Sequence, residues 1–182
     1  MKDEVSAIKK ISSGSIDNIN VIVEVPKGSN IKYEVDKDSG VLFVDRKLFT
    51  AMFYPSNYGF IPSTLEDDGD PVDVLVLGEF TLVPLSVIRV RSVGVLNTED
   101  EEGIDSKIIA VPIDKIDPGF TSIEDVKDIP QYLKNQIEHF FQHYKELEGG
   151  KYVKISGWGN KQMADKKISD AILRFSNKFS YN

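Results

Sequence analysis

The sequence predicts an α+β protein that is mainly β, with one long helix and a C-terminal helix. Three observations carry this prediction. Short apolar runs bounded by Gly, Pro and Asp recur from residue 19 to 113, as is typical of strands joined by turns. Apolar residues then take up 3.6-residue spacing over residues 133–147 and again over 168–175. The chain has no strand–helix alternation of the kind that builds a doubly wound sheet.

Seven strands are predicted, and the first ends at Pro26. They are INVIVEV, IKYEV, VLFV, VDVLVLGEF, LSVIRVRSVGVL, KIIAVPI and, after the long helix, YVKISGW. The second and third flank the turn DKDSG, where Gly40 is available for a positive φ, so we expect a hairpin there. The segment FTAMFYPSNYGFIP, residues 49–62, is aromatic and rich in turn formers.

The long helix has start and stop signals. Pro130 stands where a helix can begin, behind Asp128 as an expected cap, and Gly149-Gly150 ends the pattern. Its apolar stripe is Leu133, Ile137, Phe140, Phe141, Tyr144 and Leu147, and that of the terminal helix is Ile168, Ala171, Ile172 and Phe175. We expect residues 1–182 to form a single domain, with residues 1–16 as a loosely ordered lead-in.

Composition excludes several classes of site and partner. The net charge of −7 disfavours nucleic acid or an anionic membrane as the main partner, since both attract a positive field. With no cysteine and two histidines, thiolate sites, cysteine nucleophiles and a three-histidine zinc site are excluded. No apolar run reaches the length of a membrane span, and the first 15 residues lack the apolar core of a secretory signal. We expect a soluble, cytoplasmic protein.

An acidic cluster, DDGDPVD, leads directly into an apolar strand. Two carboxylates about 4 Å apart repel by roughly 4 kcal/mol at an effective dielectric near 20, so such a cluster is either solvated or held by cations. Gly69 permits a tight turn and Pro71 fixes φ, which would hold the aspartates at a defined geometry. The pattern matches an EF-hand loop poorly, and hard oxygen donors suit Mg²⁺. From pattern alone, a solvated turn stays an equal alternative.

The second acidic cluster, EDEEGID, reads by itself as a solvated hairpin loop. If the two loops converge, divalent ions could bind between them. Phosphate oxygens accept hydrogen bonds from ammonium, guanidinium and phenol groups, so basic and phenolic residues could complete a site. Taken singly, each is more typical of a surface charge or of core packing; they are Lys32, Arg46, Lys107, Lys145, Tyr54, Tyr58 and Tyr144. His139 and His143 stand four apart on the long helix, where packing or a subunit contact is favoured over metal binding.

These residues resemble those of family I soluble inorganic pyrophosphatases. The signature D-G-D-P-V-D stands intact at 68–73, and segments from about residue 17 to 160 follow the family order. They include VEVPKGSNIKYEVDKDSGVLFVDR, TAMFYPSNYGFIP, VIRVRSVGVL, KIIAVP and HFFQHYKELE. Phe60 stands where Tyr is common and Ser156 where Glu is familiar, and the first 16 residues and the tail after Trp158 diverge. These departures bear on subunit contacts and stability more than on chemistry.

The resemblance implies hydrolysis of inorganic diphosphate to two orthophosphates, with several divalent ions, normally Mg²⁺. It also implies a five-stranded antiparallel OB-like barrel and a homohexamer. By position, the catalytic residues would be Asp70, Arg46, Lys32 and Tyr58, with Asp70 accepting the proton of the attacking water. The metal ligands would be Asp68, Asp73, Asp105, Asp100 and Glu24, with Glu101 beside them. The substrate-binding residues would be Lys32, Glu34, Arg46, Tyr54, Tyr58, Lys107, Tyr144 and Lys145.

Other classes of protein share some of these features. A structural or regulatory metal-binding β module shares the acids but does not need Lys32, Arg46, Tyr58 and Lys145 together. An OB-like binder of single-stranded nucleic acid needs a basic groove, which the acidic balance disfavours. A glycosidase needs two separated carboxyl groups rather than clusters. A catalytically impaired metal- and phosphate-binding homologue is the main alternative within the family.

Overall fold

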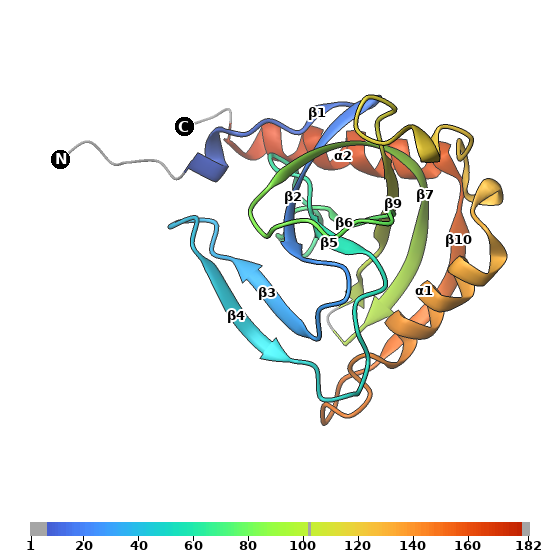
Figure 1. Ribbon diagram of the computed structural model, residues 1–182. Helices are drawn as coiled ribbons and strands as arrows, with labels where there is room; N and C mark the ends of the chain where they lie inside the picture. The colour runs from blue at the N-terminus through green and yellow to red at the C-terminus, as the bar shows by residue number, and fades with distance from the viewer. Residues whose placement is uncertain (1–6, 102, 180–182) are drawn as a thin grey trace.

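The centre of the molecule is a ring of five strands (Figure 1), seen in a computed structural model that describes residues 7–101 and 103–179. Around the ring the order is β2 (Asn18–Val25), β5 (Asn57–Phe60), β6 (Asp73–Val76), β9 (Lys107–Pro112) and β7 (Val87–Asp100). The ring closes because β7 also pairs with β2. The expected five-stranded OB-like barrel is thus confirmed as a closed ring, although not as a regular barrel.

One pairing in the ring differs from the expected antiparallel arrangement. β6 and β9 run parallel, whereas the other four neighbouring pairs are antiparallel. Strand direction must alternate around an all-antiparallel ring, and an odd number of strands cannot alternate and close. At least one parallel pair is therefore required in a five-stranded ring.

Shorter strands extend and flank the ring. β1 (Gly14–Ser15) pairs with β2, while β8 (Gly103–Ile104) and β10 (Val153–Gly159) pair with β7. β3 (Ile31–Val35) and β4 (Leu42–Lys47) form a separate two-stranded sheet that lies to one side of the ring (Figure 1). This is the predicted hairpin, and Gly40 in its turn has φ +72°. The hairpin and the ring face each other across the cavity described below.

Within the described residues, two helices cover separate parts of the apolar core, and three 3-10 turns are also present. α1 (Gln131–His143) packs Ile137, Phe140 and Phe141 against residues of β5, β6, β7 and β9. α2 (Lys161–Phe179) buries Ala164, Ile168 and Ala171 against the other side of the core, where Ile61 and Val72 lie. The 3-10 turns are η1 (Ala7–Lys10), η2 (Pro118–Phe120) and η3 (Val126–Asp128).

Three local predictions were wrong at α1 and β5. Asp128 does not cap α1, because its carboxylate accepts the backbone N–H groups of Glu124 and Asp125, and Pro130 is the cap residue instead. Leu147 is not on the helical stripe, since α1 ends at His143 and Leu147 is exposed. β5 lies inside the segment that was expected to form turns. No strand was predicted there because its four residues include a glycine and show no alternation of polar and apolar residues.

Residues 7–15, within the expected lead-in, contain η1 and β1, and the Ser13 carbonyl accepts the Asn20 N–H at 2.8 Å. Residues 1–6 lie outside the described part of the chain. Within the described residues, no helix combines the length and apolar character that crossing a membrane requires.

Candidate active site

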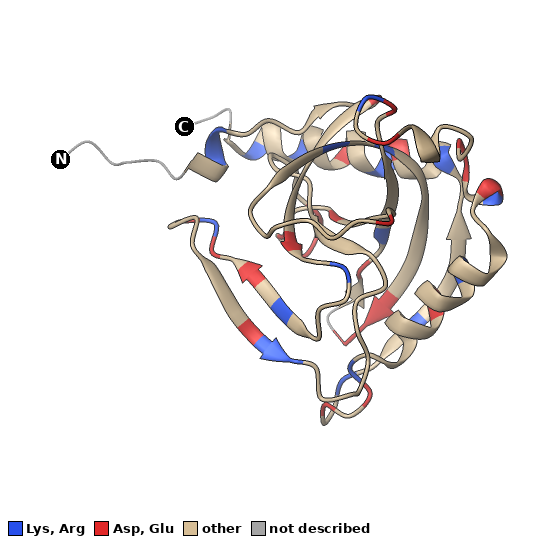
Figure 2. Cartoon of the chain, in the orientation of Figure 1, with Lys and Arg blue, Asp and Glu red and all other residues tan. Residues whose placement is uncertain are grey.

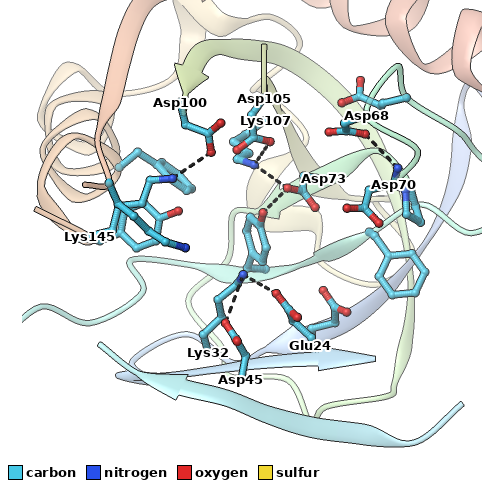
Figure 3. A pocket seen from close by; sticks show the side chains of 18 of the residues that line it. Glu24, Lys32, Asp45, Asp68, Asp70, Asp73, Asp100, Asp105, Lys107 and Lys145 are labelled. Carbon is cyan, nitrogen blue, oxygen red and sulfur yellow. Dashed lines mark hydrogen bonds and ion pairs between the residues drawn. The ribbon is translucent and has the colours of Figure 1, made fainter. Parts of the chain in front are cut away.

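A cavity of about 350 Å³ is lined by residues of the ring, of the β3–β4 hairpin and of the end of α1. All fourteen residues proposed from the sequence line it. Figure 3 shows the charged groups of those that it labels, such as Asp68, Asp73 and Lys107, pointing into one space. The cavity lining includes ten carboxylates and six cations. Figure 2 shows acidic and basic positions on the β3–β4 hairpin and acidic positions at the end of β7. The acids are Glu24, Glu34, Asp45, Glu66, Asp68, Asp70, Asp73, Asp100, Glu101 and Asp105, and the cations are Lys32, Lys37, Arg46, Lys107, Lys145 and Lys151. The two acidic clusters therefore converge.

The first acidic cluster is held as a tight turn between β5 and β6. The Asp70 N–H donates to Asp68 Oδ1 at 2.9 Å, and the Glu66 N–H donates to the Asp70 carbonyl at 2.7 Å. Gly69 between them has φ +97°, a conformation that favours glycine. The loop ends at Val72, whose N–H donates to Thr64 Oγ1 at 3.0 Å. These bonds leave the carboxylates of Asp68 and Asp70 at the rim of the cavity.

Asp73, the first residue of β6, joins the two acidic clusters. Its carboxylate accepts hydrogen bonds from the Tyr58 hydroxyl and the Lys107 ammonium, and the same ammonium bonds Asp105 (Figure 3). Burial opposes the charge on Lys107, but the two carboxylates outweigh it and raise its pKa. Burial also raises the pKa of Asp105 to about 6. The buried cation compensates part of the carboxylate charge at the centre of the site.

The turn after α1 brings a second buried cation to the cavity. Lys145 Nζ lies 2.9 Å from Asp100 Oδ2 and 3.1 Å from Glu101 Oε2. Lys145 is 4% exposed, and burial opposes its charge, but these hydrogen bonds raise its pKa. Because Tyr144 is the C-cap residue of α1, the end of the helix determines where both residues meet the cavity. Burial raises the pKa of Tyr144, so its phenol stays protonated and can donate to an anion.

The hairpin supplies the opposite wall. Lys32 on β3 bonds Glu34 and lies 3.5 Å from Asp45, whereas Arg46 on β4 pairs with Asp45 and with Glu148 at 2.9 Å. Glu24 on β2 accepts the Val35 N–H at 2.8 Å, and burial raises its pKa to about 7. The cations on this wall thus face acids from the ring across the cavity.

Packed aromatic rings form the floor of the site. The Tyr54 ring lies 4.7 Å from Phe140 and 5.6 Å from Tyr58, measured between centroids. Burial raises the pKa of Tyr54 and of Tyr58, so both phenols are neutral donors. α1 therefore supports the phenolic residues through its apolar stripe.

Sequence reasoning missed several residues that line or support the cavity. Asp45, Glu66, Lys37 and Lys151 are lining residues, and Glu148 is an 8% exposed partner of Arg46. Glu148 lies 102 positions from Arg46 in the chain, so no local pattern could have indicated their contact. The only available signal was the number of acids in the segment after α1.

The donor set suits hard divalent cations. Carboxylate oxygens are the protein ligands that Mg²⁺ prefers, and acids such as Glu24 and Asp105 are buried at a cost that a cation would offset. Among residues 7–101 and 103–179, however, no three acids or histidines lie close enough to form a ready-made metal site. Lys107 stands between Asp73 and Asp105, so ligands would need to adjust as an ion binds.

The two histidines of α1 lie outside the cavity lining. Their ring centroids are 4.7 Å apart, and His143 Nδ1 is 2.7 Å from Glu146 Oε2. The two histidines are therefore given no role in catalysis. Their expected role in a subunit contact stays a prediction.

Comparison with known proteins gives the family. The sequence profile described as inorganic pyrophosphatase matches residues 21–176, which is most of the chain. The chain belongs to the inorganic pyrophosphatase family. Membership implies a hydrolase that acts on diphosphate and depends on divalent metal ions.

Individual relatives of this family match over nearly their full length. An inorganic pyrophosphatase of Sulfolobus acidocaldarius is 60% identical over 169 residues, covering 92% of this chain and 98% of the relative. An inorganic pyrophosphatase structure from Coxiella burnetii has a TM-score of 0.88 at 48% identity, covering 91% of this chain and 99% of that one. One from Thermus thermophilus has a TM-score of 0.90 at 43% identity, covering 94% and 99%.

Proposed function

We propose that this protein hydrolyses inorganic diphosphate to two orthophosphates, with a water activated by divalent metal ions. One observation carries the proposal: two acidic loops, distant in sequence, meet in one cavity with buried lysines and phenols. Acids alone would suit a cation-binding module, and cations alone would suit an anion-binding one. Their combination suits an anionic substrate that is bound together with cations, as membership of the pyrophosphatase family supports.

The cations and phenols would bind the phosphate oxygens. Lys32 and Arg46 on the hairpin would hold one end of diphosphate, and Tyr144 and Lys145 would donate from the turn after α1. Tyr54, Tyr58, Lys107 and Glu34 complete the substrate-binding set. Arginine suits this task because its planar guanidinium donates two parallel hydrogen bonds to phosphate. Glu148 and Asp45 already orient that guanidinium.

Asp68, Asp73, Asp100, Asp105 and Glu24 would hold the metal ions. Bound divalent ions would neutralise phosphate charge and lower the pKa of a coordinated water, which makes a nucleophile available near neutral pH. Asp70 would take the proton from that water, because its carboxylate lies at the rim beside the ligand Asp68. Asp73 would be the central ligand of this set, since its carboxylate lies at the centre of the cavity, where it accepts hydrogen bonds from Tyr58 and Lys107.

The test is release of orthophosphate from diphosphate with Mg²⁺, with chelator, and with ATP as the control substrate. We expect release from diphosphate with Mg²⁺, none with excess chelator, and little from ATP, since most of the residues that line the cavity of about 350 Å³ are charged and suit a small, highly charged substrate. Release that survives chelation, or equal release from ATP, would overturn the proposal. Mg²⁺ as the preferred ion, the single domain over residues 1–182, the homohexamer and the cytoplasmic location stay predictions.

A further inference from the structure

The loop that carries Asp68 and Asp70 is tied to the C-terminal helix, about 100 residues later in the chain. Leu65 N–H donates to the Ala171 carbonyl at 3.1 Å, and Arg174 donates back to the Leu65 carbonyl at 2.9 Å. Lys167 Nζ lies 3.1 Å from Glu66 Oε1. An exposed ion pair between Arg174 and Asp67 at 3.3 Å adds a fourth contact, so α2 is joined to three consecutive residues of the loop.

These contacts come from one face of α2. Lys167, Ala171 and Arg174 are spaced four and three residues apart, which places them in a row along the helix. Ala171 is fully buried and Ile168 packs in the core with Ile61 and Val72, the residues that flank the loop. The helix is thus anchored in the core at the point where the loop begins and ends.

Glu66 connects α2 to the turn that carries Asp68 and Asp70. Its side chain is 12% exposed and bonded to Lys167, while its N–H bonds the Asp70 carbonyl and its carbonyl accepts the Gly69 N–H at 3.2 Å. A displaced Glu66 would therefore displace both ends of the tight turn. We propose that α2 is a positioning element for this loop, and that Lys167 and Arg174, through Glu66 and Leu65, fix where Asp68 and Asp70 lie.

This inference rests on the proposed function for its chemistry but is tested without turnover. The first measurement is calorimetric Mg²⁺ binding in the absence of diphosphate, followed by KM and kcat for diphosphate. Lys167→Ala should weaken Mg²⁺ binding about 5-fold, the upper range for losing a partly buried ion pair, and lower kcat by a similar factor. Lys167→Arg keeps the pair and should bind Mg²⁺ within about 2-fold of the wild type.

Lys166→Ala is the matched control. Lys166 is the next residue of the same helix, its side chain is 75% exposed, and it pairs at 2.7 Å with Asp170. Its removal costs the helix a similar ion pair but should leave Mg²⁺ binding and kcat within about 2-fold of wild type. Equal effects of Lys166→Ala and Lys167→Ala would overturn the proposal.

A double-mutant cycle distinguishes positioning through Glu66 from a general effect on the helix. Glu66→Gln should weaken Mg²⁺ binding as much as Lys167→Ala, and the double variant should be no weaker than either single variant. Effects that multiply would overturn the proposal, as would wild-type binding by Glu66→Gln. Glu66→Gln and Lys167→Arg nearly preserve side-chain volume. Mg²⁺ binding by these two variants therefore tests the proposal even if Lys167→Ala does not fold. If the wild type binds Mg²⁺ but releases no phosphate, the proposed function is wrong, whereas the double-mutant cycle still tests the positioning role through Mg²⁺ binding.

Discussion

Asp70 and its neighbour Asp67 have the same side chain in the same acidic run but stand in different surroundings. Asp70 lines the cavity, whereas Asp67 is 91% exposed and outside the lining, with an ion pair to Arg174 that contributes little. We predict that Asp70→Asn lowers kcat roughly 10²- to 10⁴-fold, the usual contribution of a general base, because an amide cannot accept the proton. Phosphate release under saturating Mg²⁺ measures this.

Asp67→Asn is the control for that substitution, and it should retain kcat within about 2-fold of wild type because its charge lies in solvent. Mg²⁺ binding by Asp70→Asn should be close to that of wild type, since the ligand set is intact. A fully active Asp70→Asn enzyme would show that another group accepts the proton.

Glu24 gives a prediction about stability in the absence of metal. Burial raises its pKa from 4.5 to about 7, so the folded state keeps a proton that the unfolded state loses between these values. Because the unfolded state then binds fewer protons, the free energy of unfolding must fall as pH rises from about 4.5 to about 7. The loss is about 3 kcal/mol from this group.

Glu24→Gln carries no titrating group and should lack this loss. Urea unfolding in chelator at pH 5 and pH 8 measures the difference, and the other buried acids cancel because both proteins contain them. Glu79→Gln, at an 88% exposed side chain, should keep the wild-type dependence. Parallel pH profiles for wild type and Glu24→Gln would contradict the assignment.

At the scale of elements, closure of the ring depends on a glycine. Gly59 of β5 lies against β2, and a Cβ there would stand 2.0 Å from the Ile22 carbonyl oxygen. Because that neighbour is backbone of a core strand, Gly59→Ala should lower the free energy of unfolding by about 3 kcal/mol, at the upper end for overpacking. The urea midpoint measures this. Gly149→Ala, with no atom within 4 Å of the added Cβ, should stay within about 0.5 kcal/mol of wild type.

Elements with strong local patterns were predictable, whereas those defined by distant partners were not. The hairpin turn and the apolar stripe of α1 up to Tyr144 follow from spacing, since both express local backbone and burial preferences. The position of β5 and the point where α1 ends depend instead on contacts with other strands and with the residues of the cavity. The site shows the same division: the signature aspartates were recognisable, but Glu66 and Glu148 act through residues about 100 positions away.

At the scale of the whole molecule, the predicted homohexamer has a direct test. Light scattering should give about six times the chain mass of 20.4 kDa at micromolar concentration. His139 and His143 of α1, which belong to the expected subunit contact, lie outside the cavity lining. A monomer mass would contradict the prediction without touching the chemistry of the cavity. Replacing His139 with a charged residue should lower the mass of the assembly measured by light scattering, while Mg²⁺ binding stays at the wild-type level.

Metal binding should also stabilise the whole fold. Among the described lining residues, ten carboxylates stand against six cations, which is an excess of negative charge. The folded state should therefore bind divalent ions for which the unfolded chain has no formed site. Free Mg²⁺ at 100 times its dissociation constant would then raise the free energy of unfolding by about 2.7 kcal/mol. Thermal unfolding across a Mg²⁺ titration measures this, with sodium chloride at matched ionic strength as the control. Asp73→Asn should lose most of the Mg²⁺-dependent gain in stability, because it removes the carboxylate shared by both halves of the site. An equal gain in stability from sodium chloride would mean that general screening, and not bound metal, offsets the repulsion between the carboxylates.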